Sequence, residues 1–464
     1  MSNTPTEKDG AIYDARQLGM PKMLILGLQH MFAMFGATIL VPILVNSYFH
    51  GEGLSIQVTL FFAGVGTLFF HICAKLKVPA FLGSSFAFLG GFATVAELNS
   101  GIFADMTYGE KLPYACGGIV MAGLLYLVLA LVIRLVGVKR VMRFLPPVVT
   151  GPIIICIGLS LAGSAINNAQ TNWFLALVAL VVIIVFNIWG KGMFKIIPIL
   201  MGVMISYAVA LAMQFAGMTN PDGSTIIDFS STASSAWVGL PDFIICKFNL
   251  TAILVMAPIA IATMMEHIGD MSAISATVGE NFLEDPGLHR TLVGDGLATA
   301  LSAFFGGPAN TTYGENTGVL ELSRVFDPAV IRIAAVYAVV LSFVPKFASI
   351  IGSMPASIIG GVSFILYGMI SAIGIRNVVE NRVDLTNSRN LIIAAVILVC
   401  GLGFSSGLTF EIAGTSITLT SLAIASIAGI LLNAILPGND YEFGVSPEGD
   451  MNRGVTLKAR HRKD

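Results

Sequence analysis

The feature that most constrains this chain is a succession of long apolar runs separated by short charged or turn-rich breaks. Stretches such as 124–133, 174–186 and 392–404 sit in apolar segments of roughly 18 residues or more, the length that a helix needs to cross hydrocarbon. Only 11% of the 464 residues are charged, against about 25% in soluble domains. The pattern predicts an all-α polytopic membrane protein.

The runs divide the chain into about fourteen transmembrane segments, counted from the apolar stretches between breaks. They are predicted to begin near Met23, Ser55, Val78, Pro113, Leu145, Trp173, Ile196, Leu250, Thr291, Pro308, Ala329, Pro355, Asn390 and Ser416.

The orientation follows from the distribution of basic residues. A polar segment, 1–22, precedes the first apolar run, which is long enough to be a membrane helix and not a cleaved signal peptide. Basic residues gather in this segment, at 134–143, at 376–389 and in the tail 437–464. Since basic residues favour the cytoplasmic side, both termini are predicted to be cytoplasmic.

The longest outer connection, 218–249, is rich in Ser, Thr and Asp and divides the chain into two halves, 23–217 and 250–436. Each half holds seven predicted spans, so the second half must enter the membrane from the opposite side. The chain is therefore predicted to contain an inverted repeat.

Local similarities between the halves support this repeat. The segments 145–155 and 354–364 each carry a proline five residues before a glycine. The segments 78–91 and 306–319 are both short, interrupted by glycine and rich in hydroxyl groups. Paired broken segments are the best sequence indication of a transporter's midplane binding site.

Two carboxylates, Glu266 and Glu315, lie in apolar sequence forty-nine residues apart. An ionisable side chain at membrane depth costs roughly 2.5 to 3.5 kcal/mol and usually faces a polar cavity. Glu315 lies in a broken segment, whose freed backbone N–H and C=O groups suit a flat polar ligand. Structural roles stay open, because Glu315 could cap its own segment and Glu266 could make a helix-packing hydrogen bond.

Asp270 follows Glu266 by one helical turn and shares its face. Two carboxylates that close disfavour simultaneous ionisation, which lets one of them gain and lose a proton. Alternatively, Asp270 belongs to a cytoplasmic-side hydrogen-bond network away from substrate. His267 and His30 are interpreted as packing or network residues, and Phe86 offers an aromatic face to a flat ring.

Several motifs together are more specific than any one of them. They are LQHMFAMFGATILVP (28–42), VPAFLGSSFAF (78–88), EHIGDM (266–271), DPGLHR (285–290) and NTTYGENTGV (310–319). With these motifs the chain resembles the nucleobase–ascorbate transporter family, in its bacterial uracil permease branch. The resemblance continues through 360–368 and 381–385 and covers nearly all of the chain.

The resemblance implies a seven-plus-seven inverted topology in a bacterial cytoplasmic membrane. Spans 1–4 and 8–11 would form a core domain, and spans 5–7 and 12–14 a gate domain. Short antiparallel strands in the third and tenth spans would meet at the binding site. The resemblance also implies a homodimer through the gate domains and import of uracil with protons.

The resemblance also assigns the ligand contacts. Glu266 and Glu315 would bind the polar edge of the pyrimidine, and the backbone N–H groups of Phe86 and Gly314 would meet its carbonyls.

Further residues are assigned by their motif positions. Ala37 and Tyr313 would line the pocket, and Asp270 would hold the transported proton together with Glu266. On the gate side, Ser363 and Tyr367 match positions that face the core.

One position departs from the family pattern. Uracil permeases commonly carry His where this chain has Asp270, and xanthine-type relatives often carry Asp there. Xanthine-type relatives, however, usually have Gln-Asn in place of Glu315 and Asn316, which favours uracil over xanthine for this chain. Asp295 is a further acid that could join the core network. Protons and sodium both remain open as the coupling ion.

Other classes of function fit less well. The net charge of -2 argues against nucleic acid as a partner. The five cysteines are scattered singly and suggest neither a disulfide framework nor a metal site. No cofactor is expected, and no nucleophile–base pair indicates an enzyme. A channel or anion exchanger of related architecture would present a basic or neutral site instead of this acidic one.

Overall fold

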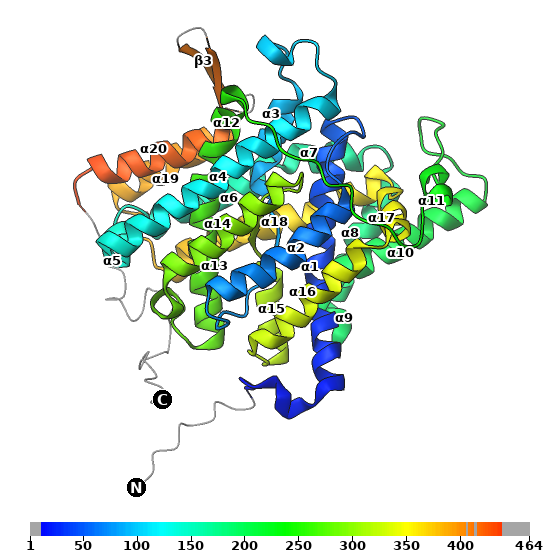
Figure 1. Cartoon of the computed structure of the whole chain (residues 1–464), viewed down its shortest axis with the longest axis horizontal. Helices are drawn as coiled ribbons and strands as arrows, with labels where there is room; N and C mark the ends of the chain where they lie inside the picture. Colours follow the sequence, from blue (N-terminus) through cyan, green and yellow to red (C-terminus); the bar gives the residue numbers. More distant parts are fainter. Residues whose placement is uncertain (1–10, 405–406, 413–414, 439–464) are drawn as a thin grey trace.

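The computed structural model describes residues 11–404, 407–412 and 415–438, most of which lie in helices (Figure 1). The first half contains α1 (Met20–Tyr48), α2 (Ile56–Cys73), β1 (Leu82–Ser84), α3 (Leu89–Ala96), α4 (Tyr108–Val136), α5 (Val138–Met142), α6 (Pro147–Ser160), α7 (Ala162–Ala169), α8 (Trp173–Trp189), α9 (Met193–Ile196) and α10 (Pro198–Phe215).

The remainder of the chain contains α11 (Ser230–Ser234), α12 (Leu250–Met256), α13 (Ala260–Val278), α14 (Leu288–Phe304), β2 (Asn310–Thr312), α15 (Gly314–Ser323), α16 (Pro328–Ser342), α17 (Pro345–Gly352), α18 (Ala356–Glu380), α19 (Ser388–Gly403), β3 (Leu408–Ile412), β4 (Thr415–Leu419) and α20 (Ser421–Ile435). Short turns are η1 (Ala15–Leu18), η2 (Phe86–Phe88), η3 (Gly101–Phe103), η4 (Ala257–Ile259) and η5 (Leu283–Gly287).

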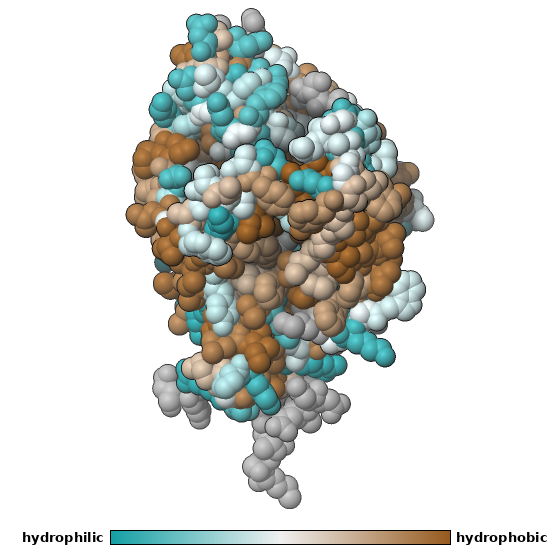
Figure 2. Space-filling view, turned by 90° about the vertical axis from the view of Figure 1, so that its right-hand side faces the viewer, coloured by the Kyte–Doolittle hydropathy of each residue, from teal (hydrophilic) through white to brown (hydrophobic). Residues whose placement is uncertain are grey.

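The long helices make this a multi-pass membrane protein. Within the described residues, seven helices are long and apolar enough to cross a bilayer: α1, α2, α4, α6 with α7, α10, α12 with α13, and α18. The pair α16 and α17 would make an eighth span, bent by 87°. Figure 2 shows apolar surface across the middle of one face, with hydrophilic residues gathered above and below it.

Two of the predicted segments are not full-length helices. The segment near Val78 consists of β1 followed by the eight-residue helix α3. The segment near Pro308 consists of β2 followed by the ten-residue helix α15. The short strands that the family resemblance implies are therefore present, and they occur where glycine and proline interrupt the apolar sequence.

The prediction of an otherwise all-α chain is wrong at one place, because β3 and β4 form a second antiparallel pair. Leu408 lies opposite Leu419, and the hydroxyl groups of Thr409 and Thr418 lie 2.9 Å apart across the pair. The segment predicted to begin as a helix near Ser416 begins as β4, and α20 follows it. Apolar and polar residues alternate along β3, LTFEI, and this alternation favours a strand.

The helices pack in two groups. In one, α2, α4, α14 and α16 make the most extensive contacts, joined by α1 and α12. In the other, α6, α7, α8, α10, α18, α19 and α20 pack together. The first group allows very close approach where α4 meets α14, because a Cβ atom at Gly123 would lie 2.5 Å from the Gly296 carbonyl oxygen. Small residues permit such helix packing in membranes.

The connection 218–249 is anchored to both groups. Near its start, Gln214 of α10 makes two hydrogen bonds with the backbone of Ile227, at 2.6 and 3.1 Å. Further along, the N–H of Ile244 donates to the carbonyl of Phe305, just after α14, at 3.2 Å. The connection therefore passes from the α10 side of the molecule to the α14 side.

Candidate functional site

The site is built around the two short strands. β1 and β2 pair antiparallel, with Leu82 opposite Thr312, Gly83 opposite Thr311 and Ser84 opposite Asn310. Each strand is followed at once by helical structure, η2 and α3 after β1 and α15 after β2. The amino-terminal ends of two short helices therefore start from one small sheet. These ends carry backbone N–H groups that have no partner within the helix.

Threonine side chains from the neighbouring helices hold the backbone of both strands. The Leu82 N–H donates to the Thr67 hydroxyl of α2 at 2.9 Å. In the other strand, the Asn310 N–H donates to the Thr299 hydroxyl of α14 at 3.1 Å, and that hydroxyl donates to the Asn310 carbonyl at 3.0 Å. Backbone groups that a membrane would leave unsatisfied thus have partners inside the protein.

A second pair of contacts holds the backbone two residues before Leu82 and two residues before Asn310. His71 of α2 lies 2.8 Å, through Nε2, from the carbonyl oxygen of Ala80. The Ser302 hydroxyl of α14 donates to the Pro308 carbonyl at 2.7 Å. We call the four side chains Thr67, His71, Thr299 and Ser302 the strand brace. Helices α2 and α14 support the two strands in the same way.

Gly83 in β1 leaves room for the ring of Tyr313, the residue that follows β2. The Tyr313 hydroxyl donates to the Ser84 carbonyl at 2.9 Å, and the Ser84 hydroxyl donates to the Thr38 carbonyl of α1 at 3.0 Å. A Cβ atom at Gly83 would collide with the Tyr313 ring. Glycine is required at that position because the ring lies directly on the backbone.

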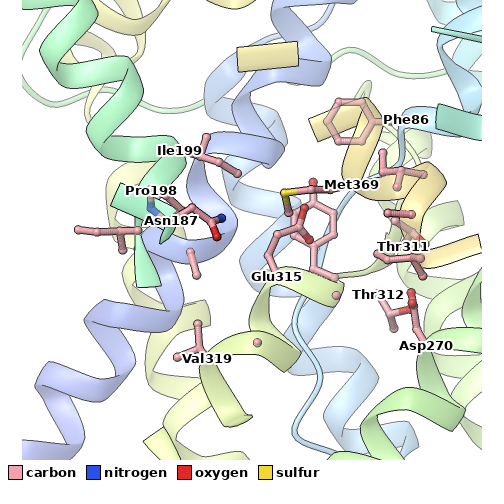
Figure 3. A pocket seen from close by; sticks show the side chains of 18 of the residues that line it. Phe86, Asn187, Pro198, Ile199, Asp270, Thr311, Thr312, Glu315, Val319 and Met369 are labelled. Atoms are coloured by element: carbon pink, nitrogen blue, oxygen red, sulfur yellow. The ribbon is translucent and has the colours of Figure 1, made fainter. Parts of the chain in front are cut away.

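A cavity of about 430 Å³ opens beside the sheet, within the size range of small-molecule sites. Its lining comes from α1 of the first packing group, from α10 and α18 of the second, and from α13 and α15. Figure 3 shows Glu315 pointing into the space between Phe86 and the α10 residues Pro198 and Ile199. The cavity is therefore positioned where the two groups meet.

Three carboxylates line this cavity. Glu266 and Asp270 lie one turn apart on α13, and Glu315 lies in the first turn of α15. The Asp270 carboxylate accepts a hydrogen bond from the Thr312 hydroxyl at 2.7 Å. Asp270 thus lies at the cavity and is tied to the strand that leads to Glu315.

The aromatic and backbone groups assigned from the family also lie here. Phe86, Tyr313 and Gly314 all line the cavity. The Tyr367 ring of α18 packs edge-on against Phe86, with the ring centroids 5.9 Å apart. Phe86 is therefore held between the sheet and the opposite helix group.

Three other assigned positions are not among the residues that line the cavity. Ala37 is fully buried in α1, and the cavity is lined by Ala33, one turn earlier. Ser363 and Tyr367 are buried in α18, and the cavity is lined by Met369 further along that helix. Ala33 and Ala37 share one face of α1 and differ in their position along the helix axis, whereas Tyr367 and Met369 point to different faces of α18. Motif positions alone do not give this.

His267 and Asp295 form a separate pair. The His267 Nδ1 lies 2.9 Å from the Asp295 carboxylate, and both side chains are completely buried. Neither residue lines the cavity. Asp295 thus joins α14 to α13 behind the acids, and His267 has the network role predicted for it.

His30 likewise serves a network. The Asn316 side-chain amide donates to the His30 carbonyl at 3.0 Å and lies 3.2 Å from the His30 Nδ1. This contact joins α1 to α15 one residue after Glu315. Asn316 therefore orients the helix that carries the acid.

Sequence reasoning missed several residues of the cavity wall. Thr311 and Thr312 line the cavity and belong to the motif NTTYGENTGV (310–319), where their hydroxyl groups indicate a polar site. Asn187, Lys195 and Arg376 also line the cavity. Asn187 and Lys195 lie on the consecutive helices α8 and α9, and Arg376 lies on α18. None of them carries a local signal of a site.

Sequence comparisons with known proteins find permeases over most of the length of this chain. A sequence model of the permease family matches residues 21–410. A uracil permease of Bacillus caldolyticus is 41% identical over 430 residues, covering 89% of this chain and 92% of that protein. A putative pyrimidine permease, RutG, of Escherichia coli strain K12 is 36% identical over 440 residues, covering 94% of each.

Solved structures are similar in fold. The transmembrane domain of a cyanobacterial bicarbonate transporter, BicA, gives a TM-score of 0.61 at 14% identity, covering 90% of this chain and 99% of that one. The structure of SLC26A9 gives a TM-score of 0.64 at 12% identity, covering 91% of this chain and 66% of that one.

Proposed function

This chain belongs to the nucleobase–ascorbate transporter family of permeases, and from that premise we propose that it imports uracil together with protons. It is a transporter and not an enzyme. The membrane would be the bacterial cytoplasmic membrane, with both termini inside. The observation that carries the proposal is the cavity lined by Glu266, Asp270 and Glu315 beside two helix starts.

The chemistry of the cavity matches a pyrimidine base. Uracil presents N–H donors and carbonyl acceptors around one flat ring. Glu266 and Glu315 would accept the N–H groups, and the free backbone N–H groups of Phe86 and Gly314 would donate to the carbonyls. The Phe86 ring would stack on the base.

Uracil is favoured over xanthine by Glu315. Relatives named uracil permeases share most of their length with this chain. Asn316, the next residue, is engaged with His30, which leaves Glu315 as the side chain of this pair that lines the cavity. A xanthine or other nucleobase symporter is the alternative.

Proton coupling is proposed from the arrangement of acids. Asp270 and Glu266 share one face of α13, and their charges repel each other. A proton bound with the base would relieve this repulsion, and its release inside would favour release of the base. Sodium is the alternative coupling ion.

We further propose the fourteen-span inverted architecture, with the two packing groups as core and gate. The strand brace supports it, because α2 and α14 occupy matching places in the two halves and hold β1 and β2 alike. Pro146 and Pro355, which begin α6 and α18 in the same way, support it too. A homodimer through the gate belongs to the same proposal.

An anion exchanger is the competing class, since solved structures of this fold include a bicarbonate transporter. The three carboxylates outnumber the two basic side chains in the cavity lining, Lys195 and Arg376, and each ionised carboxylate repels an anion, so the cavity disfavours an anion.

The test is uptake of labelled uracil in cells that lack their own uracil transport. Uptake should saturate, increase as the outside becomes more acidic, and continue without sodium. Unlabelled uracil should compete more strongly than xanthine. Competition by xanthine alone would move the assignment to the alternative substrate.

The variant Glu266→Gln should abolish this uptake while the protein still reaches the membrane. Glu97→Gln provides the matched control, because Glu97 lies at the end of α3, away from the cavity lining. Normal uptake by Glu266→Gln would remove Glu266 from the binding site.

A further inference from the structure

Residues Ile12–Ala15, which precede α1, lie against the far ends of the two helices that carry the acids. The Tyr13 hydroxyl donates to the carbonyl of Val278, the last residue of α13, at 2.9 Å. The Ile12 N–H donates to the carbonyl of Arg324, the residue after α15, at 2.8 Å. We call Ile12–Ala15 the amino-terminal clamp.

Further contacts fix the clamp in place. The Phe326 N–H donates to the Ile12 carbonyl at 2.8 Å, and the Tyr13 and Phe326 ring centroids lie 5.5 Å apart. Ala15 is fully buried, and its N–H donates to the Asp327 carboxylate at 2.8 Å. The same carboxylate caps α16 through the Ala329 N–H, also at 2.8 Å.

The clamp therefore adds a connection, at their far ends, between two helices that also contact each other directly. Glu266 and Asp270 lie on α13, and Glu315 lies at the start of α15. Both helices run from the cavity to the end of the molecule where α1 begins (Figure 1). Because short helices are stiff, holding their ends together limits how far the acids can separate.

We propose that Tyr13 is a positioning residue that sets the spacing of the acid-bearing helices and thereby the affinity for the transported base. The proposal rests on the function proposed above. A binding constellation must be held to within about 0.5 Å by its support. Tyr13 acts from a distance and does not contact the base.

The test is the full-length variant Tyr13→Phe, which keeps the ring against Phe326 and removes the hydrogen bond to Val278. The KM for uracil uptake should increase about three- to tenfold, the change expected from one lost hydrogen bond, with the maximal rate per transporter unchanged. Backbone hydrogen exchange should become faster at the end of α13.

Tyr337→Phe is the matched control. Its hydroxyl donates to the Leu24 carbonyl of α1 at 3.4 Å in an exposed position, so this hydrogen bond involves neither acid-bearing helix. It should leave both KM and exchange at α13 unchanged. An unchanged KM in Tyr13→Phe would overturn the proposal, whether or not exchange becomes faster. If the wild-type protein takes up no uracil, the proposed function is rejected instead. Backbone hydrogen exchange at the end of α13 then tests the clamp alone, and an unchanged exchange rate in Tyr13→Phe overturns it.

Discussion

At the scale of single residues, Asp270 differs from the two glutamates of the cavity in its surroundings, which indicates that base binding and proton coupling rest on different acids. It lines the cavity together with Glu266, and its carboxylate is already occupied by the Thr312 hydroxyl. Glu266 and Glu315 are partly open to the cavity. We therefore propose that Glu266 and Glu315, which are open to the cavity, bind the base. Asp270, whose carboxylate already accepts the Thr312 hydrogen bond, binds the proton.

The variant Asp270→Asn tests this division. The amide oxygen still accepts from Thr312, so uracil binding to the purified protein should stay within about threefold of the wild type. The amide cannot carry a proton, so accumulation against a gradient and its increase at acidic external pH should be lost. Measurement of binding and of accumulation at two pH values checks both parts, and retained pH-dependent accumulation would place the proton elsewhere.

Sequence reasoning identified the acids because a carboxylate in apolar sequence is conspicuous. It placed Ala37 in the pocket, whereas Ala33 lines the cavity one turn away. It also passed over Thr311 and Thr312, since a hydroxyl costs little at membrane depth and gives a weak signal. Which side chain of a helix faces a cavity depends on packing between distant segments.

At the scale of elements, the strands β1 and β2 depend on the strand brace. Without the hydroxyl of Thr299, both the N–H and the carbonyl of Asn310 would lose a partner in a dry environment. Leaving buried groups unsatisfied costs about 1–3 kcal/mol.

The variant Thr299→Val should therefore lower the melting temperature of the purified protein and weaken uracil binding. Thr299→Ser, which keeps the hydroxyl, should restore both. Thr94→Val is the control, because the Thr94 hydroxyl bonds only within its own exposed turn, to Gly90. Equal melting temperatures for Thr299→Val and Thr94→Val would show that the brace contributes nothing.

The broken segments were predictable from their glycine and proline, but their pairing as strands came from the family resemblance. Three residues give too short an alternation to define a strand. In the hairpin of β3 and β4, apolar and polar residues alternate over all five residues of β3 and over the last four of β4. It was missed because apolar membrane sequence around it masks the period of two.

At the scale of the whole molecule, the connection 218–249 joins the two packing groups, as do the segments 137–146 and 343–355, and it must accommodate any movement between them. Gln214 anchors it to α10 at Ile227. Beyond that point the ammonium of Lys346 donates to the Thr232 carbonyl at 2.6 Å, which anchors it to α17. The short stretch 228–231 between these anchors is therefore the part of the connection that can change shape when the two packing groups move.

An insertion of a protease site between Asp228 and Phe229 should therefore be tolerated, and cleavage there should leave most uracil uptake intact. Both cut ends keep their own anchors. The same insertion between Phe243 and Ile244 should abolish uptake, since the Ile244 N–H bonds to Phe305. Uptake assays before and after cleavage compare the two sites, and loss of uptake at the first site would show that the connection must be continuous.

The strand brace has a consequence for how such a transporter can change over evolution. The backbone of the binding site is held from behind by α2 and α14, whereas the groups that face the base come from a few side chains of α13, α15 and η2. Recognition can therefore be altered one side chain at a time without rebuilding the scaffold. A library confined to positions 86, 266 and 315, whose side chains are proposed to face the base, is where new base specificities should be found.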